Sequence, residues 1–457
     1  MNPPLFQGPP TVRRLPPQVR AVVALIAGFA ALIAIGTVLL ASPMASEGDR
    51  TTTLVDALFT SVSATSDTGL IVVDTGDHWS LFGEVVLVVL MFVGGIGIMA
   101  SATVAVLLGR RATLERRAQV SDVFGGPLGN AREIVRGTLA FAVSVQVVGA
   151  AAFLVLLLLN GTLGTHGGPV WNAVFQSVSA FNNAGFDTIG RGRGYTAFAA
   201  EPLVLLVTAA LVVIGGLGFV ISLDVSAKRR WRPLALETKL VVIGSVVLIL
   251  IGWAAVLGFE WTNAQTIGAL QPLDKLTNAL FMGISPRSAG FSTVTMTDLR
   301  PETNVVLGIL MFIGGASGST AGGIKVGTFA VLVLVALSVA ARREEPEAFG
   351  RRVPSAAVYR AITVLFIFLV MNAVGVLLVA AVSNAAIGHA AFDAVSALGT
   401  VGLSLGSSSE YGDAARLALA ACMFFGRLGP LAVIILLFGR HPEAAPIHRP
   451  EEPIRIG

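Results

Sequence analysis

Apolar residues fall into long runs along the chain, separated by shorter stretches that carry the charges, glycines and prolines. Most runs reach the ~20 residues that a helix needs to cross a bilayer, and they are far longer than ordinary strands. They lie at about 21–41, 80–108, 134–159, 201–225, 236–259, 303–340, 355–382 and 413–438. We therefore predict an all-α membrane protein with eight transmembrane helices.

Four shorter apolar stretches lie between these runs, at about 53–66, 170–182, 275–286 and 390–398. At ~10–14 residues they are too short to cross ~30 Å of hydrocarbon, so we predict four re-entrant pore helices buried within the protein. Polar residues suited to helix N-termini lie near their starts, namely Asp56, Asn172, Asn278 and Asp393.

Each short stretch contains the same phrase. It reads Phe59-x-x-Val62-Ser63-Ala64, Phe175-x-x-Val178-Ser179-Ala180, Phe281-x-x-Ile284-Ser285-Pro286 and Phe392-x-x-Val395-Ser396-Ala397. A glycine follows each serine by 6, 6, 5 and 6 residues, at Gly69, Gly185, Gly290 and Gly402. The phrase is therefore repeated four times with nearly fixed spacing.

A second phrase follows each glycine: MFVGGIG at 91–97, VVIGGLG at 212–218, MFIGGASG at 311–318 and MFFGRLG at 423–429. Together the two phrases define four repeats of span, pore loop and span, at residues 21–108, 131–226, 236–340 and 355–438, with tails at 1–20 and 439–457. Four such units favour a pseudo-fourfold arrangement about one axis.

Four glycine loops that converge on an axis within a membrane are the parts of an ion pore lined by backbone carbonyls. Glycine suits this role because the required backbone angles disfavour a side chain. One such glycine alone would indicate only a turn, but four in register favour a pore. The candidate ion-binding residues are Thr68, Gly69, Asn183, Ala184, Gly185, Ser288, Ala289, Gly290, Thr400, Val401 and Gly402.

Composition agrees with a membrane protein. The 457 residues are 54% hydrophobic and 13% charged, with a mean hydropathy of +0.80. The single cysteine, Cys422, excludes an intramolecular disulfide and a cysteine-based metal site. We expect the first apolar run to be a retained span, because it is long for a signal peptide.

The charges are sorted by loop. The segments that would face the cytoplasm hold 22 Lys/Arg and 11 Asp/Glu, whereas the outer segments hold 7 and 16. This asymmetry predicts that both termini are cytoplasmic. The pI of about 9.6 thus reflects topology rather than nucleic-acid binding. The acidic outer face would concentrate cations at a pore mouth.

The sixth apolar run contains a glycine-rich segment that an ordinary span would not carry. We predict two helical pieces joined by a flexible loop that obstructs permeation below the glycine loops. This gate comprises Gly314, Gly315, Ala316, Ser317, Gly318, Ser319, Thr320, Ala321, Gly322 and Gly323. A close helix contact through small residues is an alternative. A rhomboid-like protease with a GASG motif is a remote one, because all five histidines lie in loops or at segment edges.

Three charged residues accompany this arrangement. Arg427 replaces the second glycine of the second phrase and would either hold the gate or repel cations there. Lys325, at the exit of the gate, would either contribute to it or extend toward the cytoplasm. Asp67 precedes Gly69 by two residues and would either accept hydrogen bonds behind the loop or add to the field that attracts cations.

The motifs TSDTGL, SAFNNAGF, SPRSAGF and SALGTVGLSLG, with MFIGGASGSTAGGIK and MFFGRLGPL, resemble those of the Trk/Ktr/HKT potassium transporters, most of all the bacterial KtrB-type membrane subunits. The likeness spans about residues 20–440. It implies potassium ions bound in four glycine filters, a homodimer with one pore per protomer, and a cytosolic KtrA-type nucleotide-binding ring. Asp67 departs from the usual apolar or small residue of the family, which leaves the selectivity of the first filter open.

The sequence predicts a transporter and not an enzyme. It contains no glycine-rich nucleotide motif, so control by nucleotide would come from a partner. The main alternative is a secondary transporter that couples potassium to sodium or protons. That class favours inverted repeats, whereas all four repeats here begin on the same side. Whether sodium gates or couples transport stays open.

Overall fold

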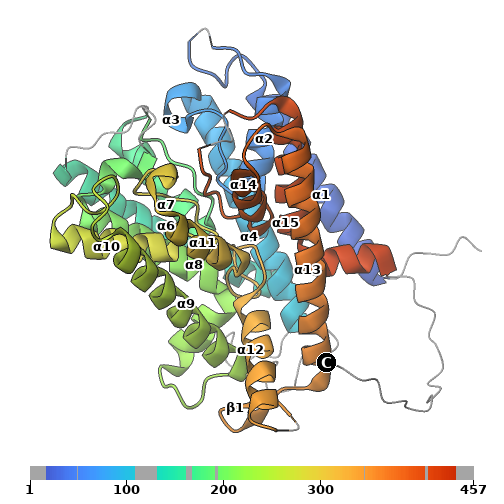
Figure 1. Cartoon of the computed structure of the whole chain (residues 1–457). Coiled ribbons are helices and arrows are strands. Elements are labelled where there is room, and N and C mark those ends of the chain that lie inside the picture. Colours follow the sequence, from blue (N-terminus) through green and yellow to red (C-terminus); the bar gives the residue numbers. More distant parts are fainter. Residues whose placement is uncertain are drawn as a thin grey trace, which may run out of the picture.

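The computed structural model describes residues 17–48, 50–108, 131–160, 167–190, 194–343, 345–406 and 410–438. The predicted tails and the basic loop 109–132 fall largely outside these ranges. Within them the chain is almost entirely helical, and the helices stand roughly side by side (Figure 1).

Each predicted repeat contains a long helix, a short helix, a glycine loop and a second long or broken helix. The first long helices are α1 (Pro17–Leu40), α6 (Ala131–Asn160), α9 (Leu236–Glu260) and α13 (Ser355–Val382). The short helices are α2 (Leu54–Thr65), α7 (Gly168–Asn182), α10 (Pro272–Ile284) and α14 (Ile387–Gly399). The last helices are α4 (Leu81–Leu108), α8 (Pro202–Lys228), the pair α11 (Pro301–Phe312) and α12 (Val326–Ala340), and α15 (Asp413–Phe438).

Small elements complete the fold: α3 (Thr75–His78), η1 (Gly194–Phe198), η2 (Met296–Asp298) and a hairpin of β1 (Glu347–Ala348) and β2 (Arg351–Arg352).

Five described helices are long and apolar enough to cross a membrane: Val22–Leu40, Val135–Leu159, Pro202–Lys228, Leu236–Glu260 and Ser355–Val382. The predicted run 303–340 is divided into two shorter apolar helices, as the glycine-rich segment suggested. The other two predicted runs correspond to α4 and α15.

The polar residues predicted to begin the short helices are not their N-caps. The caps are Thr53, Gly167, Gln271 and Ala386, one or two helical turns earlier. Only Thr53 uses its side chain as a cap, accepting from the amide of Asp56. The predicted residues instead hold neighbouring segments: Asn172 accepts a hydrogen bond from Thr188, and Asp393 accepts from Leu405 and Tyr411.

Each short helix packs between long helices, and the arrangement closes on itself. The first, α2, contacts α1, α4 and the last helix of the chain, α15. The next, α7, contacts α4, α6 and α8, and α10 contacts α8 and α9. Finally α14 contacts α11, α13 and α15. The last described helix thus packs against the first repeat, and the four glycine loops face the middle.

The last glycine of the second phrase breaks the helix in three repeats. Gly218 in α8, Gly318 between α11 and α12, and Gly429 in α15 all have left-handed backbone, with φ of 74°, 77° and 77°. The equivalent Gly97 stays helical within α4. The sequence predicted only the break in the third repeat, because the other two interrupt otherwise apolar runs.

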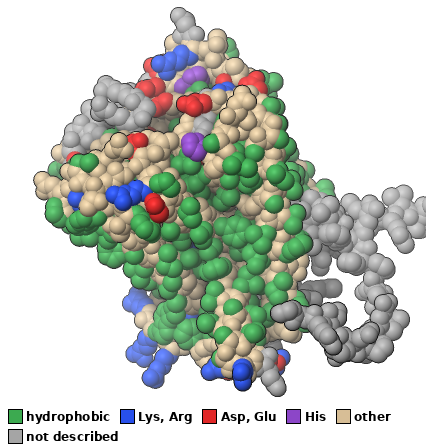
Figure 2. Space-filling view, viewed as in Figure 1, with side chains coloured by type: hydrophobic (Ala, Val, Ile, Leu, Met, Phe, Trp, Pro, Cys, Tyr) green, Lys and Arg blue, Asp and Glu red, His purple; other side chains and the backbone are tan. Residues whose placement is uncertain are grey.

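A broad apolar band crosses the face of the molecule seen in Figure 2. Most of the visible carboxylates lie above this band, toward the end that carries α3, and Lys and Arg gather at the opposite end, near β1 (Figures 1 and 2). Burying such a band is favourable only in hydrocarbon, so the molecule has the surface of a membrane protein.

Candidate functional site

The four glycine loops, residues 67–70, 183–186, 288–291 and 400–403, meet in the middle of the fold. Their glycines all have left-handed backbone, with φ of 88° at Gly69, 72° at Gly185, 77° at Gly290 and 95° at Gly402. A Cβ added to Gly69 would lie 2.6 Å from the Ala184 carbonyl oxygen, and one on Gly185 would lie 3.0 Å from the Ala289 oxygen. A side chain at either position would have to displace a carbonyl of the next loop.

The contacts continue around a closed circle. A Cβ on Gly290 would lie 2.6 Å from the Val401 oxygen, and one on Gly402 would lie 2.1 Å from the Thr68 oxygen. Each glycine therefore packs against the residue before the next glycine, and the fourth loop returns to the first. This brings together all eleven residues that the sequence singled out as ion-binding candidates.

The residue two positions before each glycine also has left-handed backbone, although none of the four is glycine. The φ angles are 49° at Asp67, 59° at Asn183, 70° at Ser288 and 47° at Thr400. All four residues are fully buried. Such strained conformations persist only when surrounding contacts hold them. The same backbone path recurs in all four loops, so their carbonyls form successive equivalent sets.

The serine of the first phrase anchors each loop, a role that sequence reasoning did not assign. Ser63 donates to the Leu70 carbonyl (2.8 Å) and accepts from the Gly69 amide (3.1 Å). Ser179 donates to Phe186 (2.6 Å), Ser285 donates to Phe291, and Ser396 accepts from Gly402 (3.1 Å). The exact recurrence of serine was the available signal.

The third loop is one residue shorter than the others, and a tighter first turn compensates for the missing residue. In the other loops a residue before the glycine donates its amide to a carbonyl five residues back, as from Thr68 to Ser63 (2.9 Å). Ala289 instead donates to Ser285, four residues back (3.0 Å). The tighter turn absorbs the missing residue, so Gly290 still reaches the shared position.

The segment between α11 and α12, residues 313–325, forms a closed loop beside the glycine loops. Its ends pair through Gly314 N to Ile324 O (2.9 Å) and Ile324 N to Phe312 O (3.2 Å). Its middle lies against the second repeat, where Ala316 donates to Gly216 O (2.8 Å). All ten predicted gate residues lie in this α11–α12 loop, and its backbone is almost wholly buried.

Three cations donate to carbonyls of this loop. Arg427 Nη1 donates to Thr320 O, and Lys325 Nζ donates to Ala321 O (2.5 Å). Arg287 Nη2 donates to Gly314 O (3.3 Å). The sequence placed Arg427 and Lys325 here but did not single out Arg287, whose side chain turns from the third glycine loop toward this segment.

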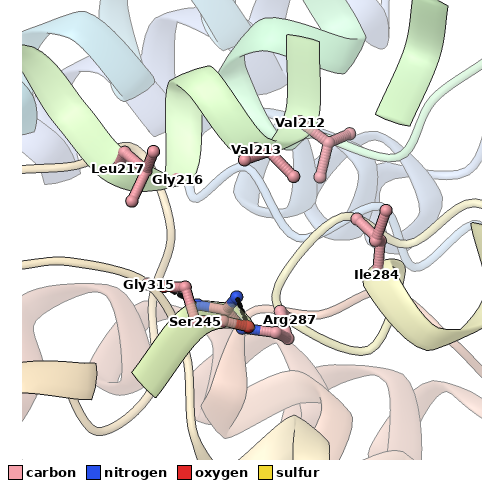
Figure 3. Close-up of a pocket in the computed structure, with 8 residues that line it drawn as sticks. All are labelled: Val212, Val213, Gly216, Leu217, Ser245, Ile284, Arg287 and Gly315. Atoms are coloured by element: carbon pink, nitrogen blue, oxygen red, sulfur yellow. Dashed lines mark hydrogen bonds between the residues drawn. The ribbon is translucent and has the colours of Figure 1, made fainter. Parts of the chain in front are cut away.

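Arg287 lines a small cavity together with residues of α8, α9, α10 and the α11–α12 loop (Figure 3). Its guanidinium donates to Ser245 Oγ (3.0 Å) and Ser245 O (3.2 Å). The cavity, of about 20 Å³, has room for about one water molecule. On its other side lie the apolar residues Val212 and Val213 and the backbone at Gly216 (Figure 3).

Asp67 is the carboxylate that faces these cations. Its Oδ2 accepts from Arg427 Nη2, and both side chains are buried, at 0% and 2% exposure. Of the two roles that the sequence left open, the geometry places the carboxyl group behind the first glycine loop, as a hydrogen-bond acceptor. At the equivalent Gly95 and Gly315 a Cβ would lie 2.5 Å and 2.6 Å from a neighbouring oxygen, so those two positions have no room for a side chain like that of Arg427.

The chain matches the profile of TrkH, described as a cation transport protein, over residues 19–448. It is 34% identical to the Ktr system potassium uptake protein B of Bacillus subtilis, covering 93% of both chains. It is 31% identical to the potassium/sodium uptake protein NtpJ of Enterococcus hirae, covering 97% of this chain and 99% of that protein.

The fold also matches a solved structure. The crystal structure of the potassium transporter TrkH from Vibrio parahaemolyticus aligns with a TM-score of 0.73 at 22% identity, covering 93% of this chain and 86% of the other. That likeness concerns the fold. Together with the profile match over most of the sequence, it places these loops and helices in a known architecture, and the chain belongs to the TrkH family of cation transport proteins.

Proposed function

We propose that this protein takes up potassium through a pore lined by the carbonyls of the four glycine loops. The observation that carries the proposal is the closed circle of Gly69, Gly185, Gly290 and Gly402, each packed against the residue before the next. Carbonyl oxygens arranged around an axis can replace the water around a cation. The name of the Bacillus relative gives potassium as the ion, and that of the Enterococcus relative gives potassium and sodium.

The short helices support cation binding at this point. Each of α2, α7, α10 and α14 ends at its glycine loop. The negative end of a helix dipole therefore lies beside each loop, which favours a cation at the axis. The carboxylates at the α3 end would raise the local cation concentration where ions enter.

The selectivity of the pore is testable by replacing a glycine with serine. We expect Gly69→Ser and Gly290→Ser to lower the preference for potassium over sodium, because the new side chain must displace a neighbouring carbonyl. Uptake of both ions is measured in a bacterial strain that lacks its own potassium transporters, with membrane insertion checked by immunoblot. Unchanged relative uptake in both variants would refute the assignment of the filter.

The α11–α12 loop is the proposed gate. It lies against the glycine loops, and three cations occupy its carbonyls at Gly314, Thr320 and Ala321. Oxygens that already accept from Lys or Arg cannot solvate a passing potassium ion, and the net positive charge opposes its entry. Closure thus has both a steric and an electrostatic component.

Two variants test the gate. Deletion of part of residues 314–323 removes the obstruction, and Arg427→Gln removes the charge that holds Thr320. Both should raise potassium flux into liposomes per correctly folded protein in the absence of a regulator. A role as a mere helix contact predicts misfolding, seen by size-exclusion chromatography. If both variants are well folded and no more active than the parent, the loop is not the gate.

Regulation would come from partners at the end that carries β1. We propose that the protein is a homodimer in a bacterial plasma membrane, with both termini cytoplasmic and a KtrA-type nucleotide-binding ring on this basic face. Its described part includes Arg229, Arg230, Arg351 and Arg352, all exposed. Co-purification with a KtrA-type protein tests the ring. Full nucleotide-responsive transport by the isolated chain would contradict it.

Dependence of potassium uptake on external sodium tests whether sodium gates or couples transport.

A further inference from the structure

Two residues of the glycine loops are linked to the α11–α12 loop through their side chains, Ser288 directly and Asp67 through Arg427. We propose that these residues, Asp67 and Ser288, are positioning residues that fix the geometry of the filter only while the gate is closed. The preference for potassium over sodium would then depend on the position of the gate. This inference rests on the proposed function of the glycine loops and adds a connection between them and the gate.

The first contact runs through Arg427. One nitrogen of its guanidinium donates to Asp67 in the first glycine loop, and another donates to Thr320 O in the α11–α12 loop. A single side chain from α15 therefore joins the filter of the first repeat to the loop of the third. Both partners are fully buried, where charge-assisted hydrogen bonds are strong and their loss is costly.

The second contact runs through Ser288. Its hydroxyl accepts from the Gly322 amide (3.0 Å) and donates to the Thr400 carbonyl (2.6 Å). One hydroxyl thus joins the α11–α12 loop to the third and fourth glycine loops. Withdrawal of Gly322 would leave this hydroxyl without its donor and free the Thr400 carbonyl to turn.

Both residues have backbone conformations that need external support. The φ angles of 49° at Asp67 and 70° at Ser288 are strained for residues with a side chain. The Asp67 side chain is held by Arg427, which also bonds to the α11–α12 loop, and the Ser288 hydroxyl bonds to that loop directly. Movement of the loop therefore removes hydrogen bonds that hold these two strained backbone conformations. The adjacent carbonyls of Thr68 and Ala289 then relax from the closed circle.

The second repeat lacks a filter side chain of this kind and is held through backbone. Thr320 Oγ1 donates to the Phe181 carbonyl at the end of α7 (3.2 Å), and Ala316 N donates to Gly216 O (2.8 Å). The loop is therefore linked to all four repeats, to the first of them only through Arg427. Among the described residues, Asp67 and Ser288 connect its position to the filter through hydrogen-bonded side chains of the filter itself. These two residues are the ones to test.

The test uses Asp67→Asn and Ser288→Ala, each with a matched control. Asp56→Asn weakens a second ion pair between the first and last repeats, with Arg416 (2.6 Å), which lies away from the loop. Ser292→Ala removes a hydroxyl that follows the third glycine loop and bonds only locally, to Val294 O (2.5 Å) and two methionine sulfurs. The four variants are compared as purified full-length protein in liposomes.

Two quantities are measured together. The first is the ratio of potassium to sodium flux. The second is the rate at which a cysteine in the α11–α12 loop, Ser319→Cys in a Cys422→Ala background, reacts with a water-soluble thiol reagent. Ser319 is 1% exposed, so rapid modification reports that the loop has moved. A purely structural role for Asp67 or Ser288 would not make the two quantities change in parallel.

We expect Asp67→Asn and Ser288→Ala each to increase the modification rate and to lower the flux ratio. The expected change is about tenfold for Asp67→Asn, which weakens a charge-assisted hydrogen bond, and about fivefold for Ser288→Ala, which removes neutral ones. The controls should change neither quantity. Combining Asp67→Asn with Arg427→Gln should add little to either single change, because both break the same contact.

Faster modification with an unchanged flux ratio in both variants would overturn the connection, as would no change in either quantity. In those cases the parent still prefers potassium, so the proposed filter stands. A parent protein that carries no potassium current or flux at all would instead refute the proposed function. If Asp67→Asn does not fold, Ser288→Ala alone decides, since it removes one oxygen and no charge.

Discussion

Replacing Gly402 with alanine is the sharpest test of the closed circle of carbonyls. A Cβ at this position would lie 2.1 Å from the Thr68 carbonyl oxygen, and real Cβ contacts essentially never fall below 3.0 Å. The Thr68 oxygen must therefore move by at least 0.9 Å, out of its place in the circle. The left-handed backbone, with φ of 95°, adds about 1–2 kcal/mol for any residue with a side chain.

A neighbouring glycine separates these two effects. Gly406 also has left-handed backbone, with φ of 86°, but a Cβ there would lie 3.4 Å from the nearest atom of the described residues, Thr297 Cγ2. Gly406→Ala thus carries a comparable backbone cost without displacing a filter carbonyl. Both variants should lose similar thermal stability from the backbone, whereas only Gly402→Ala should alter the pore.

The assay is potassium and sodium flux into liposomes, per protein that elutes as a single size-exclusion peak. Weakening one ion–carbonyl contact by ~1.5 kcal/mol, the scale of a hydrogen bond to a charge, lowers the preference for potassium about tenfold. We expect that loss in Gly402→Ala and parental selectivity in Gly406→Ala. Equal selectivity in the two variants would refute the reasoning, because the Thr68 carbonyl would then have no part in ion binding.

Three further predictions concern residues around the filter. Burial is the main reason that the pKa of Asp187 is raised to about 7. The hydrogen bond from the Ile189 amide opposes this rise, and the charge of Asp74 adds to it. Asp187 therefore loses its negative charge as the pH falls from 8 to 6, so uptake at low external potassium should fall over that range and Asp187→Asn should flatten the profile. Ser179→Ala removes a bond to the Phe186 carbonyl (2.6 Å) and should lower both selectivity and the thermal midpoint, whereas Ser177→Ala, which removes a bond to Gln146 O, should lower only the midpoint. Arg287→Met frees the Gly314 carbonyl and should raise flux without a regulator, and unchanged flux would exclude this arginine from the gate.

The repeats and their glycines could be predicted from the sequence because both depend on local preferences. Apolar runs of membrane-spanning length specify helices in hydrocarbon wherever they lie in the chain. A glycine that recurs at fixed distance from the same phrase indicates the same backbone path, and all four do have left-handed φ. The interruption at 314–323 was equally local, since glycine is a poor helix former.

Side-chain partners could not be predicted in this way. Asp67 and Arg427 are 360 residues apart and meet only because α15 packs against α2. The sequence left two roles open for Asp67, and the ion pair places it behind the loop. The sequence did not single out Arg287 either, because position in the sequence does not tell which way a side chain turns.

Tertiary structure also decided where two helices break and what the repeated serines do. Gly218 and Gly429 lie in apolar runs that read as continuous helices, yet both have left-handed backbone, and at Gly218 this backbone packs closely against Gly318. The serines were visible as a pattern, but their partners, such as Leu70 for Ser63, depend on a loop folding back onto its helix.

Sequence alone thus determined which segments are helices and which glycines matter, because these follow from local backbone preference and hydrophobicity. The partners of the buried polar groups were decided by the fold, because hydrogen bonds depend on positions in space.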